Sequence, residues 1–411
     1  MKVADKYYNN EIKQEKVLLV GVQTPQWTDF EFENLMQEME ALVNTAGAFL
    51  DRRMMQKLAK EDGKTLLGKG KVSEIQKIIE HRNIDLVVSL NPLKPVVHRN
   101  LEEAWGCRVI DRIQLILDIF ALRAKSRAGK LQVELAQYQY LLPRIIGQGL
   151  ELSRLGGGIG TRGPGETKLE SDRRYLRARM RKIEKDLSTI EAHRERTRLK
   201  RQQGNEFNIG LVGYTNAGKS TILTKLTQSD TLVQDKLFAT LDPLTRSFAI
   251  RGFENFTLTD TVGFIEELPT KLIHAFKSTL EEISDVDLLL HVIDAGHPAR
   301  FLHEQTVLSL LKDLKMDQIP QLVVYNKIDT LNEPFQPSLF PNVQISAYRE
   351  ESIELLKEEI WQTCKSIAQP YRILIPADQA QKIYEYKQNS IVESIDFDQV
   401  KQNYIVTGFK K

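Results

Sequence analysis

The segment Phe207–Leu226 constrains the fold of this chain more than any other. It reads FNIGLV, a buried-strand pattern, then GYTNAGKS, and then the helical pattern TILTKL. A glycine-rich loop between a strand and a helix can wrap a phosphate chain with inward-pointing N–H groups, which predicts a phosphate-binding loop in an α/β sheet. Lys219 would neutralise the β- and γ-phosphates, and Ser220 would ligate magnesium. The predicted nucleotide contacts here are Gly213, Tyr214, Thr215, Asn216, Ala217, Gly218, Lys219 and Ser220.

A second strand pattern, NFTLTD, ends in the sequence Asp260-Thr261-Val262-Gly263. Asp260 would hold the magnesium ion through a water, and the Gly263 N–H would touch the γ-phosphate, so this segment can sense that phosphate. Between the two elements, Thr240 and Thr245 are the candidates for the second hydroxyl ligand of magnesium, and Thr240 is preferred mainly because the segment resembles that of known GTPases. The predicted magnesium ligands are therefore Ser220, Thr240 and, through a water, Asp260. The predicted nucleotide contacts of these segments are Phe238, Ala239, Thr240, Leu241, Asp242, Asp260, Thr261, Val262 and Gly263.

A third element, Asn326-Lys327-Ile328-Asp329 after the strand QLVVY, predicts guanine as the base. The Asp329 carboxylate can accept hydrogen bonds from the ring N–H and the exocyclic amine of guanine, and adenine offers neither donor there. Lys327 would lie along the base, and Asn326 would brace the phosphate loop. Further along, Ser346, Ala347 and Tyr348 form a strand-end turn whose backbone N–H would meet the guanine carbonyl. The ordered elements predict GTP and GDP as ligands.

The residue after Gly263 bears on hydrolysis. It is Phe264, where many small GTPases place a glutamine that orients the attacking water. The sequence thus predicts a GTPase with Lys219, Thr240 and Gly263 as catalytic residues, slow alone and accelerated by a partner. Asn216 has two interpretations: it helps to coordinate a potassium ion that offsets charge in the transition state, as in related GTPases with similar NAGKS loops, or it only braces the loop.

Periodicity and composition indicate four regions along the 411 residues. The expected regions are an N-terminal α/β domain (1–110), a basic two-helix arm (111–204) with a glycine-rich loop (146–166), a GTPase domain with a mixed, mostly parallel sheet (205–366) and a strand–helix–strand C-terminal module (367–411). In the first region, the patterns predict strands over 16–22 and 84–90 and helices over 31–45 and 72–81. Gly68–Lys71, expected just before the second of these helices, is either an anion site or a surface turn.

The arm is expected to be helical from Asp111 to about Pro143, followed by a second long helix packed antiparallel to the first. The apolar stripe of the second helix steps by three and four residues, as in a coiled-coil seam: Leu176, Met180, Ile183, Leu187 and Ile190. The intervening loop, LGGGIGTRGPGETKLE, holds Arg154, Arg162 and Lys168. It is either a loop that contacts RNA phosphates or senses nucleotide, or a flexible linker.

Charge is strongly separated along a chain with 57 basic and 55 acidic residues. Residues 111–204 carry 21 basic and 11 acidic side chains, whereas 205–366 carry 14 and 23. The basic block predicts a polyanionic partner, with a solvated helical surface as the alternative. No apolar run approaches a membrane span, and Cys107 and Cys364 lack disulfide or metal-site spacing, so each is expected to be buried. We expect a cytoplasmic monomer; peripheral membrane association of part of the population is the alternative.

Taken together, these motifs resemble the HflX family of GTPases. The resemblance is carried by LLGKGKVSEI, by DRIQLILDIFALRAKSRAGKLQVELAQ, by GGGIGTRGPGETKLESDRR and by GYTNAGKS, FATLD, DTVGF and NKID. It implies binding to the large ribosomal subunit and its RNA, stimulation of GTP hydrolysis by the ribosome, and splitting or rescue of stalled ribosomes under stress. The alternative is a ribosome- or RNA-binding module that uses GTP as an affinity switch with incidental hydrolysis, for example in subunit assembly. Leu122 and Ala128 depart from the family's runs, and the tail after Tyr371 occurs in only some members.

Overall fold

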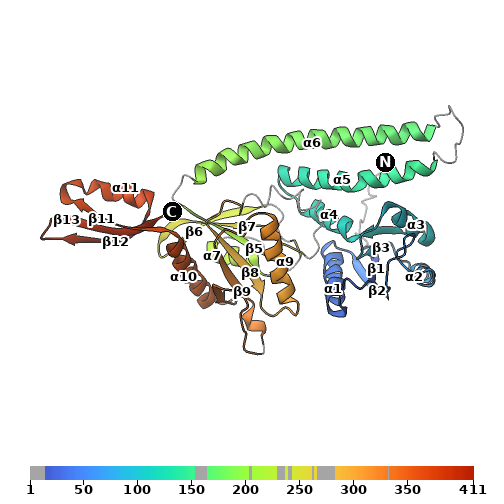
Figure 1. The fold of residues 1–411 in the computed structure, drawn as a ribbon, viewed down its shortest axis with the longest axis horizontal. Helices are drawn as coiled ribbons and strands as arrows, with labels where there is room; N and C mark the ends of the chain where they lie inside the picture. The colour runs from blue at the N-terminus through green and yellow to red at the C-terminus, as the bar shows by residue number, and fades with distance from the viewer. Residues whose placement is uncertain are drawn as a thin grey trace, which may run out of the picture. The chain divides into compact units, whose positions relative to one another are not determined.

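The computed structural model describes residues 14–152, 164–202, 206–228, 237–238, 243–261, 263–265, 283–331 and 333–411 (Figure 1). The chain divides into two compact units. The first comprises Met1–Leu122 and Gln137–Ala178, and the second comprises Arg123–Ala136 and Arg179–Lys411.

The first unit is built on a four-stranded parallel sheet with the order β2-β1-β3-β4. Its elements are β1 (Lys16–Gln23), α1 (Asp29–Thr45), β2 (Phe49–Lys57), α2 (Lys69–Arg82), β3 (Leu86–Ser89), α3 (Pro95–Trp105), β4 (Arg108–Asp111) and α4 (Arg112–Arg123). The run VLLVGV in β1 is almost fully buried, as expected for a strand covered on both faces. Helices α2 and α3 bury apolar side chains against one face. On the other, Gly21 leaves room for Met36 and Phe32 of α1.

Several boundaries in this unit differ from the sequence prediction. Pattern analysis missed β2, α3 and β4, and Gly68–Lys71 does not precede α2 but caps and begins it. The prediction of a single helix from Asp111 to about Pro143 is wrong. Helix α4 ends at Arg123, and α5 (Arg127–Leu152) begins anew and passes through Pro143. The new start has a local cause, because the Ser126 hydroxyl accepts a hydrogen bond from the Gly129 N–H at 2.9 Å, as an N-cap does.

Helix α6 (Pro164–Gln202) provides the second long helix of the arm. Within the second unit, the Arg179 guanidinium of α6 binds both carboxylate oxygens of Glu134 in α5, at 2.8 and 3.1 Å. The two residues are similarly distant from the segment that joins the helices, as antiparallel pairing requires. Of the predicted apolar stripe, Ile183 and Leu187 are buried, and the other members are partly buried.

The second unit contains a six-stranded sheet with the order β10-β9-β8-β5-β7-β6. Its strands are β5 (Phe207–Gly213), β6 (Leu244–Ile250), β7 (Phe253–Asp260), β8 (Leu288–Asp294), β9 (Gln321–Asn326) and β10 (Asn342–Gln344). Only the β6–β7 pair is antiparallel among these strands, which confirms the expected mixed, mostly parallel sheet. Helices α7 (Lys219–Thr227) and α10 (Glu350–Ile367) pack on one face, and α9 (Arg300–Asp313) packs on the other (Figure 1). The carboxyl ends of β5, β7, β8 and β9 share one edge, where the predicted motifs meet.

The C-terminal segment was predicted as strand–helix–strand, and the structure contains one more strand. Its elements are β11 (Gln369–Pro376), a short 3₁₀ turn η3 (Ala377–Gln379), α11 (Gln381–Asn389), β12 (Ile391–Asp398) and β13 (Asn403–Lys410). The strands form an antiparallel sheet with the order β11-β13-β12. Phe409 and Ile391 join the hydrophobic core of the six-stranded sheet, and Lys411 pairs with Asp287 at 2.8 Å. The segment is therefore anchored on that core.

Two further expectations concern the membrane and the cysteines. Among the described residues, no helix has the length and apolar character that a bilayer span requires. Both cysteines are free thiols. Cys364 is buried as expected, and burial raises its pKa to about 12. Cys107 is only half-buried, so the prediction of a buried side chain is wrong for it.

Candidate nucleotide site

The phosphate loop follows β5 and leads into α7, the context that its sequence predicts. Gly218 has φ 100°, and a Cβ there would lie 2.2 Å from Asn326 Nδ2, so only glycine fits. Asn326 Nδ2 donates to the Ala217 carbonyl at 2.9 Å, and its Oδ1 accepts from the Ala347 N–H at 3.0 Å. Asn326 thus connects the loop with the turn after β10.

Lys219 lies inside the loop and is 6% exposed. Its ammonium donates to the carbonyl oxygens of Gly213 at 3.0 Å and Tyr214 at 2.7 Å. Burial lowers the pKa of Lys219 to about 8, and the charge of Asp260 opposes that shift. A buried amine held this way gains from an anionic neighbour, because phosphate oxygens would stabilise its charged form.

The Ser220 hydroxyl and the Asp260 carboxylate, two of the predicted magnesium ligands, lie together. The Ser220 hydroxyl donates to Asp260 Oδ2 at 2.8 Å, and Asp260 is 1% exposed. A hydroxyl and a carboxylate are hard oxygen donors of the kind that Mg²⁺ prefers, so this pair fits that ion.

The second predicted hydroxyl ligand, Thr240, lies outside the described residues, as do Ala239, Leu241, Asp242 and Val262. Phe238 is described and buried. The alternative ligand, Thr245, belongs to β6, and its hydroxyl hydrogen-bonds to that of Thr259 at 2.9 Å. This contact holds Thr245 in the sheet, which favours Thr240 for the predicted role.

The segment after β7 lies directly against the phosphate loop. The Thr215 N–H donates to the Phe264 carbonyl at 2.7 Å, and the Phe264 N–H donates to the Gly213 carbonyl at 3.1 Å. A Cβ on Gly263 would lie 3.0 Å from Lys219 Nζ, so a side chain there would press on the ammonium. The Phe264 ring is buried in a hydrophobic cluster, and it offers no amide that could orient a water.

The Thr261 side chain, which was predicted to contact the nucleotide, binds the backbone of β5 in this structure. Its hydroxyl donates to the Leu211 carbonyl at 2.8 Å, and the residue is 1% exposed. The side chain therefore ties the residue that follows β7 to β5.

Lys327 joins the predicted guanine motif to the phosphate loop. Its ammonium donates to the Asn216 carbonyl at 2.9 Å and pairs with the Asp294 carboxylate at 2.7 Å. Asn216 itself is exposed and has φ 61°. Asp329 lies in the 3₁₀ turn η2 (Ile328–Thr330) and is exposed, as a carboxylate that binds a base must be.

The turn after β10 agrees less well with its predicted role. The Ala347 N–H, expected to meet guanine, donates to Asn326 in this structure. Ser346 is buried, and its N–H donates to Ser352 Oγ at 3.3 Å. The Tyr348 side chain is 74% exposed. Any contact of the Ala347 N–H with a base would therefore be shared with, or replace, the bond to Asn326.

Sequence reasoning missed Asp294. It ends the buried strand pattern LLLHVID at the same sheet edge as the other motifs, and that position is the signal that could have found it.

Substitution of Asp294 by alanine is expected to lower GDP affinity about five- to tenfold, because Lys327 loses a charged hydrogen-bond partner that orients it. Titration with a fluorescent GDP measures this. Asp313→Ala, which removes an exposed acid in α9, is the control. Equal GDP affinity of Asp294→Ala and the parent would show that Lys327 needs no such support.

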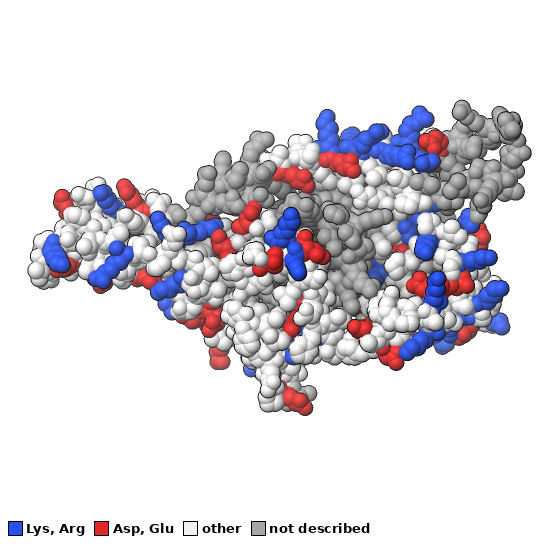
Figure 2. Space-filling view, in the orientation of Figure 1, with Lys and Arg blue, Asp and Glu red and all other residues white. Residues whose placement is uncertain are grey.

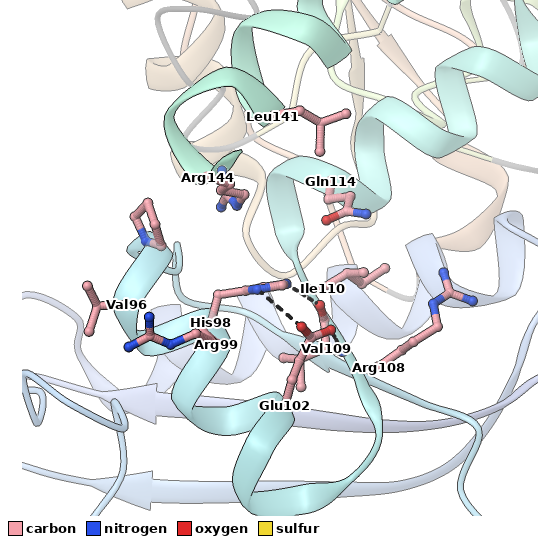
Figure 3. A pocket seen from close by; sticks show the side chains of 11 residues that line it. Val96, His98, Arg99, Glu102, Arg108, Val109, Ile110, Gln114, Leu141 and Arg144 are labelled. Carbon is pink, nitrogen blue, oxygen red and sulfur yellow. Dashed lines mark hydrogen bonds and ion pairs between the residues drawn. The ribbon is translucent and has the colours of Figure 1, made fainter. Parts of the chain in front are cut away.

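A separate hollow of about 230 Å³ lies within the first unit, between α3, β4, α4 and α5 (Figure 3). Its charged groups bind neighbouring charged or backbone groups. Arg144 binds the Asp111 carboxylate and the Leu93 carbonyl, each at 3.0 Å, and Glu102 accepts from the Val109 N–H at 3.1 Å. This hollow therefore has the features of a structural network, and it lacks the glycine loop of the site in the second unit.

Comparisons with known proteins cover nearly the whole chain. Family models match residues 33–121 ("GTP-binding GTPase N-terminal"), 123–201 ("GTP-binding GTPase Middle Region") and 208–327 ("50S ribosome-binding GTPase"). A protein named GTPase HflX from Alkalihalophilus pseudofirmus is 48% identical over 97% of this chain and 95% of its own. Another of that name, from Caldanaerobacter subterraneus subsp. tengcongensis, is 43% identical over 94% and 89%. Among solved structures, the complex of SsGBP with GDP is 26% identical, with a TM-score of 0.50 over 86% of this chain and 99% of that one.

Proposed function

The chain belongs to the HflX family of GTPases and hydrolyses GTP, and from this premise we propose that it binds the large ribosomal subunit and splits or rescues stalled ribosomes in a GTP-dependent manner. The family model that matches its GTPase domain is named for binding to the 50S ribosome. Phe264 cannot orient the attacking water, and the ribosomal partner would supply that function by ordering the segments around the γ-phosphate.

The observation that carries this proposal is the basic surface of α6. Five cationic side chains are exposed along its described middle part: Arg174, Arg177, Arg181, Lys182 and Lys185. Figure 2 shows Lys and Arg gathered over this helix. None of the five forms an ion pair with another described residue, so their charge is available to phosphates. A helix with such a surface fits an RNA backbone. The glycine-rich loop with Arg154, Arg162 and Lys168 would extend that surface, although it lies outside the described side chains.

Hydrolysis would use Mg²⁺ held by Ser220, by Asp260 through a water and by Thr240. When bound, the ion would supply positive charge that offsets the charge of the phosphates. Lys219 would hold the β- and γ-phosphates, and the Gly263 N–H would report the presence of the γ-phosphate. The exposed Asn216 side chain would either contact potassium, as predicted, or only brace the loop. Equal rates in sodium and potassium, with the partner present, would exclude that contact.

Sedimentation of intact ribosomes tests the proposal. We expect the protein to separate subunits with GTP and much less with GDP, because the γ-phosphate sets the conformation that binds. A non-hydrolysable analogue and a Lys219→Ala variant show whether hydrolysis is needed. Splitting by a variant that cannot hydrolyse GTP would favour the affinity-switch alternative. Intact ribosomes under every nucleotide would refute splitting.

The basic surface makes a further prediction. Joint substitution of Arg177, Arg181 and Lys185 by alanine is expected to weaken binding to large subunits and to reduce the slope of log affinity against log salt by about two to three, because fewer counterions are released. Binding at several salt concentrations measures the slope. The matched control replaces Lys382, Lys387 and Lys401, which are exposed in the C-terminal segment. If the α6 variant has the same slope of log affinity against log salt as the parent, the helix acts only as a spacer.

A further inference from the structure

Tyr214 is a large aromatic residue within the phosphate loop, and its ring is 6% exposed. The ring lies flat on the imidazole of His303 in α9, with centroids 3.6 Å apart and planes 8° apart. Tyr214 and His303 are 89 residues apart in the sequence. This stack therefore fixes the first half of the phosphate loop to α9.

His297 lies beside His303, with ring centroids 4.3 Å apart. Its Nδ1 accepts from the Ala299 N–H at 3.1 Å, so the ring is held at the start of α9. The backbone N–H of His297 donates to the Asp294 carbonyl at 3.3 Å. The three rings thus connect the phosphate loop with the turn that carries the partner of Lys327.

The backbone around Tyr214 contacts the groups that act on the γ-phosphate. The Tyr214 carbonyl accepts from Lys219 Nζ at 2.7 Å, and the neighbouring peptide groups bind Phe264 on both sides. A shift of Tyr214 would therefore move the Lys219 ammonium and the Gly263–Phe264 segment together. In contrast, the contact of Lys327 with Asn216 holds the other half of the loop.

We propose that His303, supported by His297, is a positioning residue for GTP hydrolysis, which holds Tyr214 so that Lys219 and the Gly263–Phe264 segment meet the γ-phosphate in the reactive geometry. Its role concerns the triphosphate more than the diphosphate, because the Gly263–Phe264 segment meets only the γ-phosphate, whereas Lys219 also holds the β-phosphate. Burial lowers the pKa of His303 to about 3, so a neutral ring forms the stack at physiological pH.

The test compares two side chains of similar size at this position. His303→Leu keeps the volume and removes the ring, whereas His303→Phe keeps a ring that can stack. We expect single-turnover GTP hydrolysis by His303→Leu to fall about three- to tenfold, the rate equivalent of one aromatic pair. GDP affinity should stay within about twofold of the parent. His303→Phe should recover most of the rate. Thr306→Ala, one turn further along α9, is the matched control.

A double-mutant cycle with Tyr214→Leu separates positioning from general damage to the fold. The double variant should be no slower than the slower single variant, because each substitution removes the same stack. Rates that multiply in the double variant would overturn the proposal. So would a His303→Leu rate equal to that of the parent, or a loss of GDP affinity and melting temperature in proportion to the loss of rate.

Discussion

Replacement of Asp329 by asparagine is expected to lower the affinity for GDP about a hundredfold and to raise that for xanthosine diphosphate. The Asp329 carboxylate is exposed at the end of the sheet, next to Lys327, and it can accept two hydrogen bonds from guanine. Asparagine offers one acceptor and one donor, so one guanine donor meets an N–H group, which costs a few kcal/mol. Xanthine carries an oxygen where guanine has its exocyclic amine, and that oxygen can accept from the new amide.

Competition titrations against a fluorescent GDP measure both nucleotides on the same protein. Glu333→Gln, a carboxylate-to-amide change at an exposed position just beyond this motif, is the control and should leave both affinities unchanged. If Asp329→Asn binds GDP as tightly as the parent, Asp329 does not read the base.

The second large effect is expected from Lys219→Ala. The ammonium is buried and held by two loop carbonyls beside Asp260, so its removal leaves the phosphates without their internal cation. Loss of one such group from a preorganised site typically costs about a hundred- to a thousandfold in rate.

Single-turnover hydrolysis with large subunits present measures this loss. Lys225→Ala removes an exposed lysine from the same helix and should retain the parent rate. A Lys219→Ala rate within about tenfold of the parent would remove Lys219 from the catalytic role predicted for it.

Much of this site could be predicted because its signals are local. A strand, a glycine loop and a helix in succession specify the loop around Lys219. Since the ends of parallel strands share an edge, Asp260 could be placed near Ser220. In the structure, Ser220 Oγ lies 2.8 Å from Asp260 Oδ2. The apolar stripe of α6, in which Ile183 and Leu187 are buried, followed from helical periodicity alone.

The rest depends on contacts that no local pattern encodes. Asp294 reads as an ordinary strand end until Lys327 is seen beside it, and the stack of Tyr214 on His303 joins residues far apart in sequence. The end of α4 was missed because apolar spacing continues across it, while the Ser126 cap starts a new helix. Strand β2 was missed because its mixed sequence, FLDRRMMQK, reflects a strand at the sheet edge, where burial is partial.

The GTP hydrolysis rate with and without purified large ribosomal subunits tests the central claim most directly. Because Phe264 offers no group to orient water, we expect slow turnover by the protein alone and a rise of at least about tenfold with large subunits. Small subunits, as the control, should have no effect. A rate that is the same with and without large subunits, for a protein that binds GTP normally, would contradict the account.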